Sequence, residues 1–132
     1  MAVTAKEVAK SQVTVTIPLP PKQMHPNARC HWRAKLRPKS RQRQAAKLNG
    51  CMQVDGFPRF TKATIQATFH LGKRGKRHDA DNLIAWLKAS IDGLQDAGVL
   101  ADDSGVTWLP PEQVFGKSAG DEKIVVLTIT GR

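Results

Sequence analysis

The stretch RHDADNLIAWLKASIDGLQDAGVLADD, residues 77–103, holds six of the eleven acidic residues of a 132-residue chain whose formal net charge is +10. On a helical wheel of 100° per residue, its apolar positions fall within about 100° of one another, which is typical of a helix that packs on a core. These positions are Leu83, Ile84, Leu87, Ile91 and Leu94. The stretch therefore predicts a helix over about 82–97, with Gly98 just past its end, where glycine is favoured.

Strand patterns lie on both sides of this helix. Apolar and polar residues alternate over 13–19 and 63–71, which predicts half-buried strands. Residues 105–117 predict a strand bent by two prolines, and residues 121–130 a terminal strand. A further helix is expected over about 41–52, with Ser40 as its N-cap. We expect a small single α+β domain over 1–132, in the order β-α-β-α-β-β, with a mixed sheet, two helices on one face and flexible residues 1–12.

The basic residues are gathered in two clusters. Residues 22–47 hold nine Lys or Arg and no acidic residue, and GKRGKRH follows at 72–78. Because protein surfaces usually mix both signs, these clusters predict a polyanionic partner, and nucleic acid is favoured. Residues 22–47 have no apolar face for a membrane surface, no apolar run is long enough to span a membrane, and no signal peptide is evident. We therefore expect a cytoplasmic protein that does not bind membranes.

Asp79 and Asp81 are the first candidate ligands. If the backbone before the helix is extended, their side chains point the same way and repel unless a cation lies between them. Mg²⁺ suits this pair because it binds hard oxygen atoms and needs only two or three carboxylates. Asn82 is a supporting candidate, either as a cap or as a partner of a water on the metal. Zinc is disfavoured, because the spacing of the His and Cys residues matches no usual ligand pattern.

On an unbroken helix, Lys88 and Asp92 lie within about 40° of Asp81. Helical side chains lean toward the N-terminus, so the Lys88 ammonium is a candidate to stabilise a phosphate or a forming oxyanion. A plain i,i+4 ion pair between Lys88 and Asp92 explains the same spacing equally well. Asp103 lies close enough in sequence for the chain to double back toward Asp81; otherwise the third carboxylate must come from elsewhere.

Three stretches together resemble the RusA family of Holliday junction resolvases, which is common in prophages. IPLPPKQMHPNARCHWRAK, residues 17–35, is similar to the Pro-rich N-terminal stretch of the family, with Asn27 in the expected place. RHDADNL, residues 77–83, is similar to its Asp-X-Asp-Asn-Leu motif. LKASIDGLQDAGVLADD, residues 87–103, resembles the segment that leads from a helix to a final Asp-Asp pair.

The resemblance implies a homodimeric, Mg²⁺-dependent endodeoxyribonuclease that resolves four-way DNA junctions by paired symmetric nicks. Asp79, Asp81 and Asp103 would be the essential, metal-binding carboxylates, with Lys88 as the catalytic lysine and Asp102 in a supporting role. Mn²⁺ is expected to substitute for Mg²⁺. The residues expected to contact DNA are Asn27, Arg29, Trp32, Arg33, Lys35, Arg37, Lys73, Arg74, Lys76 and Arg77.

The aromatic residues carry separate expectations. Trp86 lies off the apolar stripe of its helix, which favours the dimer interface slightly over a cap on the core. Trp32, and either Phe57 or Phe60, are candidates to stack on unpaired bases. Two other functions remain open: a non-catalytic basic module that binds nucleic acid, and a nuclease that acts on flaps or replication forks.

Overall fold

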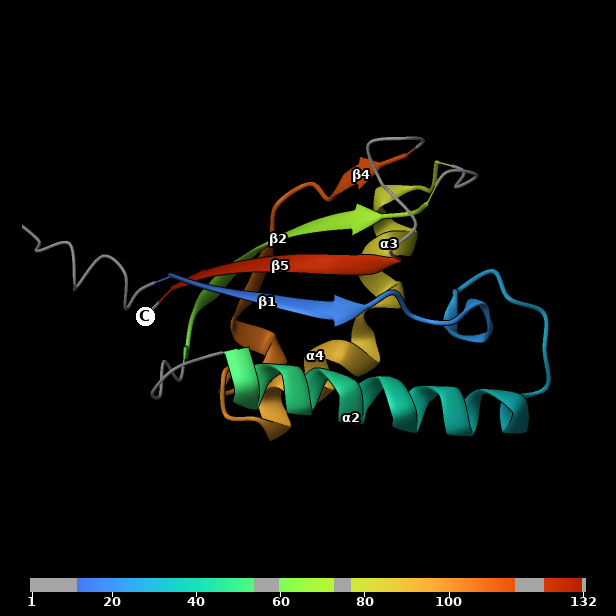
Figure 1. Ribbon diagram of the computed structural model, residues 1–132, viewed down its shortest axis with the longest axis horizontal. Coiled ribbons are helices and arrows are strands. Elements are labelled where there is room, and N and C mark those ends of the chain that lie inside the picture. Colours follow the sequence, from blue (N-terminus) through green and yellow to red (C-terminus); the bar gives the residue numbers. More distant parts are fainter. Residues whose placement is uncertain (1–11, 54–59, 73–76, 116–122, 132) are drawn as a thin grey trace, which may run out of the picture.

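A mixed five-stranded sheet forms the centre of the molecule in the computed structural model, which describes residues 12–53, 60–72, 77–115 and 123–131, without the side chain of Asp103. The strand order is β1-β5-β2-β3, and β4 also pairs with β2 (Figure 1). β5 pairs antiparallel with β1 on one side and with β2 on the other, whereas β3 and β4 run parallel to β2. The strands are β1 (Gln12–Pro18), β2 (Ala63–His70), β3 (Val106–Trp108), β4 (Glu112–Val114) and β5 (Ile124–Gly131).

The alternation in the strand sequences decides which face of the sheet is buried. In β2 every second residue from Ala63 to Phe69 is buried, and the residues between them are half-buried. β5 buries Val125, Leu127 and Ile129, and β1 contributes Val15 and Ile17 to the same core. Since side chains point alternately to the two faces of a strand, a single face carries the core. The predicted strands at 13–19, 63–71 and 121–130 are confirmed.

Helices cover the buried face of the sheet. They are α2 (Leu36–Gln53), α3 (Ala80–Trp86) and α4 (Lys88–Asp96), with short 3₁₀ turns at η1 (Lys22–Met24), η2 (Trp32–Lys35) and η3 (Asp103–Gly105). Figure 1 shows α2 and α4 running together along one side of the sheet. The prediction of a small α+β domain with a mixed sheet is confirmed, with three α-helices in the described part of the chain where two were expected. Among the described residues, no helix combines the length and the apolar character needed to cross a membrane.

The expected helix over 82–97 is two helices, which meet at Leu87. Leu87 has φ −87° and ψ 2°, outside the helical region, and the chain changes direction there. α4 packs so closely on α2 that a Cβ added to Gly93 would overlap the Arg43 carbonyl oxygen. α3 buries Leu83 and Trp86, and α4 buries residues from Ala89 to Leu94. The Leu87 N–H donates to the Ile84 carbonyl, only three residues back, at 3.1 Å, so the regular α-helical hydrogen bonding is interrupted and the prediction of one continuous helix is wrong.

The helix expected over 41–52 begins earlier, at Leu36, directly after η2. Pro38 is tolerated because it lies in the first turn, where its missing N–H has no helical partner. Ser40 is therefore inside the helix, and its predicted role as N-cap is wrong. His31 caps the preceding turn instead, since its Nδ1 accepts a hydrogen bond from the Arg33 N–H at 3.2 Å.

The two turn predictions near the end of the chain are confirmed. Gly98 has φ +81°, and the N–H of Val99 donates to the Leu94 carbonyl at 3.0 Å, which closes α4. Pro110 and Pro111 separate β3 from β4, and both of these strands pair with β2. Of the segment expected to be flexible, residues 1–11 lie outside the described residues, and Gln12 already belongs to β1.

Candidate functional site

Asp79 and Asp81 lie at the N-terminal end of α3. Asp79 is the N-cap residue, but its side chain makes no capping hydrogen bond, and Asp81 is in the first turn. Because the helix begins at Ala80, the expectation that both aspartates share an extended backbone is wrong. Both side chains are exposed, and neither carboxylate has a hydrogen-bond or ion-pair partner among the described residues. Four carboxylate oxygens are thus accessible as ligands for a hard cation.

The backbone just before Asp79 is held by β4. The N–H of His78 donates to Gln113 Oε1 at 2.8 Å, and Gln113 Nε2 donates to the His78 carbonyl at 3.0 Å. One residue earlier, the Arg77 guanidinium lies over the Phe115 ring, 5.8 Å from its centroid. The segment 77–79 therefore runs beside β4 and is supported by a strand.

A cluster of three rings joins this segment to the N-terminal basic region. The His25 ring centroid lies 5.1 Å from that of His78 and 5.2 Å from that of Trp86. Trp86 Nε1 donates to the Pro21 carbonyl at 2.9 Å, and its ring stacks on Phe69 at 6.5 Å. With an exposed fraction of 5%, Trp86 is a core residue, so the expectation of an interface position is wrong. The basic arm, which we define as residues 22–35, is thereby docked next to Asp79.

His25 is half-buried in this ring cluster. Its Nδ1 accepts a hydrogen bond from the Asn27 N–H at 3.1 Å, so the neutral ring carries its proton on Nε2. That Nε2 is buried and has no hydrogen-bond partner among the described residues. Burial lowers the pKa of His25 below its ordinary value of 6.5, and the neighbouring His78 lowers it further. A positive charge on this ring would oppose the docking of the arm.

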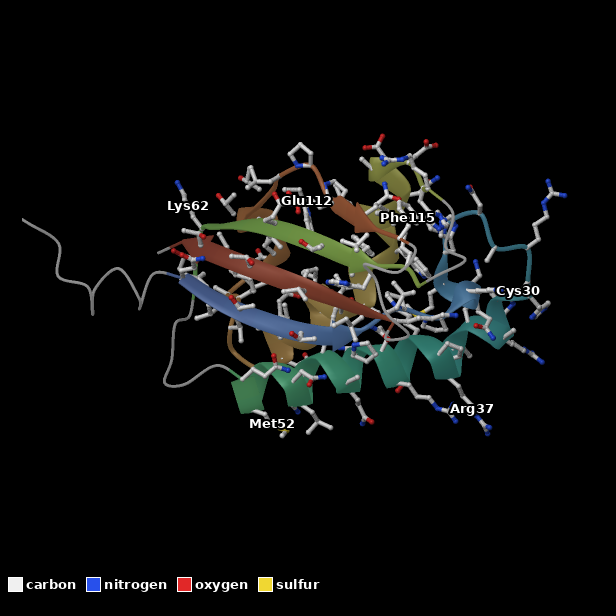
Figure 2. The ribbon with its side chains drawn as sticks, turned by 45° about the horizontal axis from the view of Figure 1, so that its top comes forward. Cys30, Arg37, Met52, Lys62, Glu112 and Phe115 are labelled. Carbon is white, nitrogen blue, oxygen red and sulfur yellow. The ribbon has the colours of Figure 1, made fainter. Side chains whose placement is uncertain are left out.

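The side chains expected to contact DNA are mostly exposed on the arm and on the start of α2. Trp32 has an exposed fraction of 60%, with the Arg33 guanidinium 5.3 Å and the His31 ring 5.6 Å from its ring centroid. Figure 2 shows Arg37 pointing away from the sheet. Asn27, Arg29 and Arg77 are also exposed, and Lys35 is half-buried.

Other residues expected to contact DNA or to stack on bases lie outside the described residues or are buried. Lys73, Arg74 and Lys76 lie outside the described residues, as does Phe57. Phe60 is 3% exposed and packs in the core, so its proposed stacking on bases is wrong.

Lys88 lies on the first turn of α4. Its Nζ is 3.6 Å from Asp92 Oδ1, which is the i,i+4 pair that the spacing also allowed. The change of direction at Leu87 means that Asp81, Lys88 and Asp92 do not form one continuous line on a helix. Asn82 is half-buried in α3.

Asp102 and Asp103 lie toward the opposite end of β2. Asp102 accepts hydrogen bonds from the N–H and hydroxyl of Ser104 at 3.4 and 2.8 Å, and Asp103 begins η3. β3 starts opposite Ala63, whereas Gln113, which holds His78, lies opposite Phe69. These two positions on β2 are about 20 Å apart at 3.3 Å per residue. Figure 1 likewise shows α3 beside β4 and the arrowhead of β2, away from the turn that precedes β3. The backbone of Asp103 thus lies toward the end of β2 away from the segment that carries Asp79, while its side chain is outside the described part of the structure. The predicted meeting of Asp79, Asp81 and Asp103 stays a prediction.

The remaining acidic residue of α4 stabilises the fold. Arg43 donates to both carboxylate oxygens of Asp96, from Nε at 2.6 Å and from a terminal nitrogen at 3.0 Å. These hydrogen bonds lower the pKa of the Asp96 carboxyl and link α4 to α2. Over the described part of the chain, no three His, Cys, Asp or Glu side chains gather closely enough to hold a metal ion.

A small groove runs between the α3–α4 junction and the edge strand β3. It has a volume of about 230 Å³ and is lined by Ile84, Ala85, Lys88, Ile91, Val106 and Trp108. Ile84, Val106 and Trp108 are half-buried, and Ala85 is exposed. Apolar surface is thus accessible between the α3–α4 junction and strand β3.

No protein-family model matches the sequence, and no curated protein matches it.

Proposed function

We propose that the protein is a cytoplasmic, Mg²⁺-dependent, structure-specific endodeoxyribonuclease of the RusA type, which resolves Holliday junctions by paired symmetric nicks. The observation that carries the proposal is the docking of the basic arm on the Asp79 segment through His25, His78 and Trp86. The arm, which carries cations for DNA phosphates, is thereby in contact with the segment that carries the carboxylates for a metal. A nuclease needs this combination, because acidic side chains alone would repel the DNA backbone.

Asp79 and Asp81 are suitable donors for Mg²⁺, because both are exposed carboxylates with hard oxygen atoms. When bound, Mg²⁺ or Mn²⁺ activates water and neutralises charge on the phosphate. The arm contributes the exposed cations Arg29 and Arg33, which bind the phosphates on either side of the cut. Trp32 offers an exposed ring to an unpaired base at the crossover.

The proposal includes a homodimer in which Asp103 of a second copy completes each metal site. The backbone positions support this, since η3, which begins at Asp103, leads into β3 opposite Ala63, whereas the segment that carries Asp79 is held opposite Phe69, about 20 Å further along β2. The groove between the α3–α4 junction and β3 offers accessible apolar surface to a second copy. Two sites related by two-fold symmetry suit a junction, which has two strands to cut. Lys88, on the wall of this groove, is proposed to stabilise the leaving oxygen.

A mixing experiment tests both the chemistry and the shared site. Asp81→Asn and Asp103→Asn chains with different tags are co-expressed, and the mixed dimer is purified and incubated with a four-way junction and Mg²⁺. Each variant alone should be inactive. The mixed dimer should regain one intact site and should nick single strands without paired resolution.

If Asp103 acted within its own chain, both sites of the mixed dimer would stay defective and no nicking would return. A wild-type protein that cuts no junction, fork, flap or duplex in Mg²⁺ or Mn²⁺ would overturn the nuclease proposal altogether. Equal cutting of forks or flaps would instead favour a flap or fork nuclease.

The second candidate is a non-catalytic module that binds nucleic acid through the arm. It is favoured by the exposed Arg29, Trp32 and Arg33 of the arm, which can bind nucleic acid without a metal. Under this alternative, wild type and Asp81→Asn bind a junction equally and neither cuts it.

A further inference from the structure

Gln113 occupies the middle of β4, and its backbone is firmly held. It lies opposite Phe69 in the parallel pairing with β2, and the next residue accepts a hydrogen bond from the Leu71 N–H at 3.0 Å. A side chain that projects from a paired strand starts from a fixed position, so the groups that it binds are also fixed.

The Gln113 amide binds both backbone groups of His78. Its Oε1 accepts from the His78 N–H at 2.8 Å and its Nε2 donates to the His78 carbonyl at 3.0 Å, as a neighbouring strand would. The His78 carbonyl belongs to the peptide that precedes Asp79. The peptide that follows is fixed as well, because the Asp79 carbonyl accepts from the Leu83 N–H at 3.1 Å. The Cα of Asp79 is thus held between two fixed peptide planes.

The Asp79 carboxylate takes no part in this fixation. Asp79 is the N-cap of α3 without a capping hydrogen bond from its side chain, so its direction follows from its backbone and two side-chain torsions. We propose that Gln113 is a positioning residue, which holds the backbone at His78 so that the Asp79 carboxylate faces the metal. This inference rests on the proposed function, because it assumes that Asp79 is a ligand.

The chain contains a matched control for this contact. Gln53, at the end of α2, binds both backbone groups of Thr16 in the same way, with distances of 2.7 Å from the Thr16 N–H and 2.9 Å to its carbonyl. This second contact lies on β1, at the opposite edge of the sheet from β4. Its loss removes the same kind of hydrogen bonds, together with one from Gln53 Nε2 to Asn49 Oδ1, at a place without a candidate ligand.

The experiment compares Gln113→Met with Gln53→Met in the full-length protein. Methionine has a similar length and no strong hydrogen-bonding group, and both positions are exposed or half-buried, so both variants should fold. Thermal unfolding should show a similar small decrease in Tm for both. Mn²⁺ affinity is measured by electron paramagnetic resonance of the free ion, and junction cleavage at saturating Mn²⁺.

For Gln113→Met we expect Mn²⁺ affinity to fall about tenfold and the cleavage rate by about 10- to 100-fold, since small misplacements of reacting groups are costly. Junction affinity without metal should stay within about twofold, because the arm is untouched. Gln53→Met should match wild type in both metal readouts.

Equal metal affinity and cleavage in the two glutamine variants would overturn the positioning role, provided that Asp81→Asn loses Mn²⁺ binding in the same assay. If Asp81→Asn binds Mn²⁺ as wild type does, the carboxylates are not ligands, and the proposed function fails together with this inference.

Discussion

The two halves of the acidic segment have similar compositions but different surroundings. At the start of α3, Asp79 and Asp81 are exposed and have no hydrogen-bond or ion-pair partner among the described residues. In α4, Asp92 lies 3.6 Å from Lys88, and Asp96 accepts two hydrogen bonds from Arg43. The α4 half has paired carboxylates, one of which links α4 to α2. The α3 half leaves its carboxylates accessible.

This difference partly explains why a basic protein gathers acidic residues in one stretch. α4 lies against α2, which belongs to the basic region, so Asp96 pairs with Arg43 across the helix contact, whereas Asp92 pairs with Lys88 on α4 itself. The aspartates at the start of α3 lie beyond that contact and next to the docked arm. Accessible carboxylates beside a basic arm are consistent with the metal-dependent chemistry that we propose, whereas the paired carboxylates of α4 are explained by packing alone.

The largest effect is expected from Asp81→Asn compared with Asp96→Asn. Loss of a metal ligand should reduce junction cleavage by at least about a hundredfold. Junction affinity should be kept or improved, because a negative charge near the phosphates is removed. Asp96→Asn should cut within about threefold of wild type and lower only the Tm. Similar cleavage by the two variants in a gel assay with Mg²⁺ would abolish the functional distinction between the two halves.

Two glycines test the structural role of the α4 half. A Cβ at Gly93 would lie 2.7 Å from Ala46 Cβ and still closer to the Arg43 carbonyl oxygen, so Gly93→Ala should cost at least about 1–3 kcal/mol of unfolding free energy through overpacking. At Gly98 no atom lies within 4 Å of an added Cβ, and the cost of Gly98→Ala comes from the positive φ alone, about 1 kcal/mol. Urea unfolding measures both, and a smaller loss at Gly93 would contradict the close packing of α4 on α2.

The smallest effect concerns pH and the docking of the arm beside the α3 half. The pKa of His25 is lowered in the folded state, so folding favours the neutral ring. The contribution of the neutral His25 ring to folding stability is fully present above the ordinary pKa of 6.5. It is lost as the pH falls through the lowered pKa of the folded state. Unfolding of wild type should therefore become easier below about pH 6.5. His25→Phe, which keeps a ring beside Trp86, should lack this part of the pH dependence, whereas His31→Phe on the exposed part of the arm should keep it. Identical pH profiles for wild type and His25→Phe would contradict the account.

Local pattern predicted much of the fold. The period of two identified β1, β2 and β5, and proline and glycine identified the bend between β3 and β4 and the end of α4. Each of these sequence patterns spans only a few residues, which is enough to predict a strand or a turn. Asp79 and Asp81 were also identified from local spacing, and the structure brings them together at one helix end.

The remaining features depended on contacts between residues far apart in the chain. The close approach of α2 at Gly93 accompanies the break at Leu87, which no proline or glycine at that position signals. Trp86 is buried because Pro21, 65 residues away, accepts its N–H, and His78 is held by Gln113, 35 residues away. The distance between Asp103 and Asp79 follows from which residues pair with the two ends of β2. Periodicity describes the direction of side chains from one element, but only the packing of several elements decides which side chains meet.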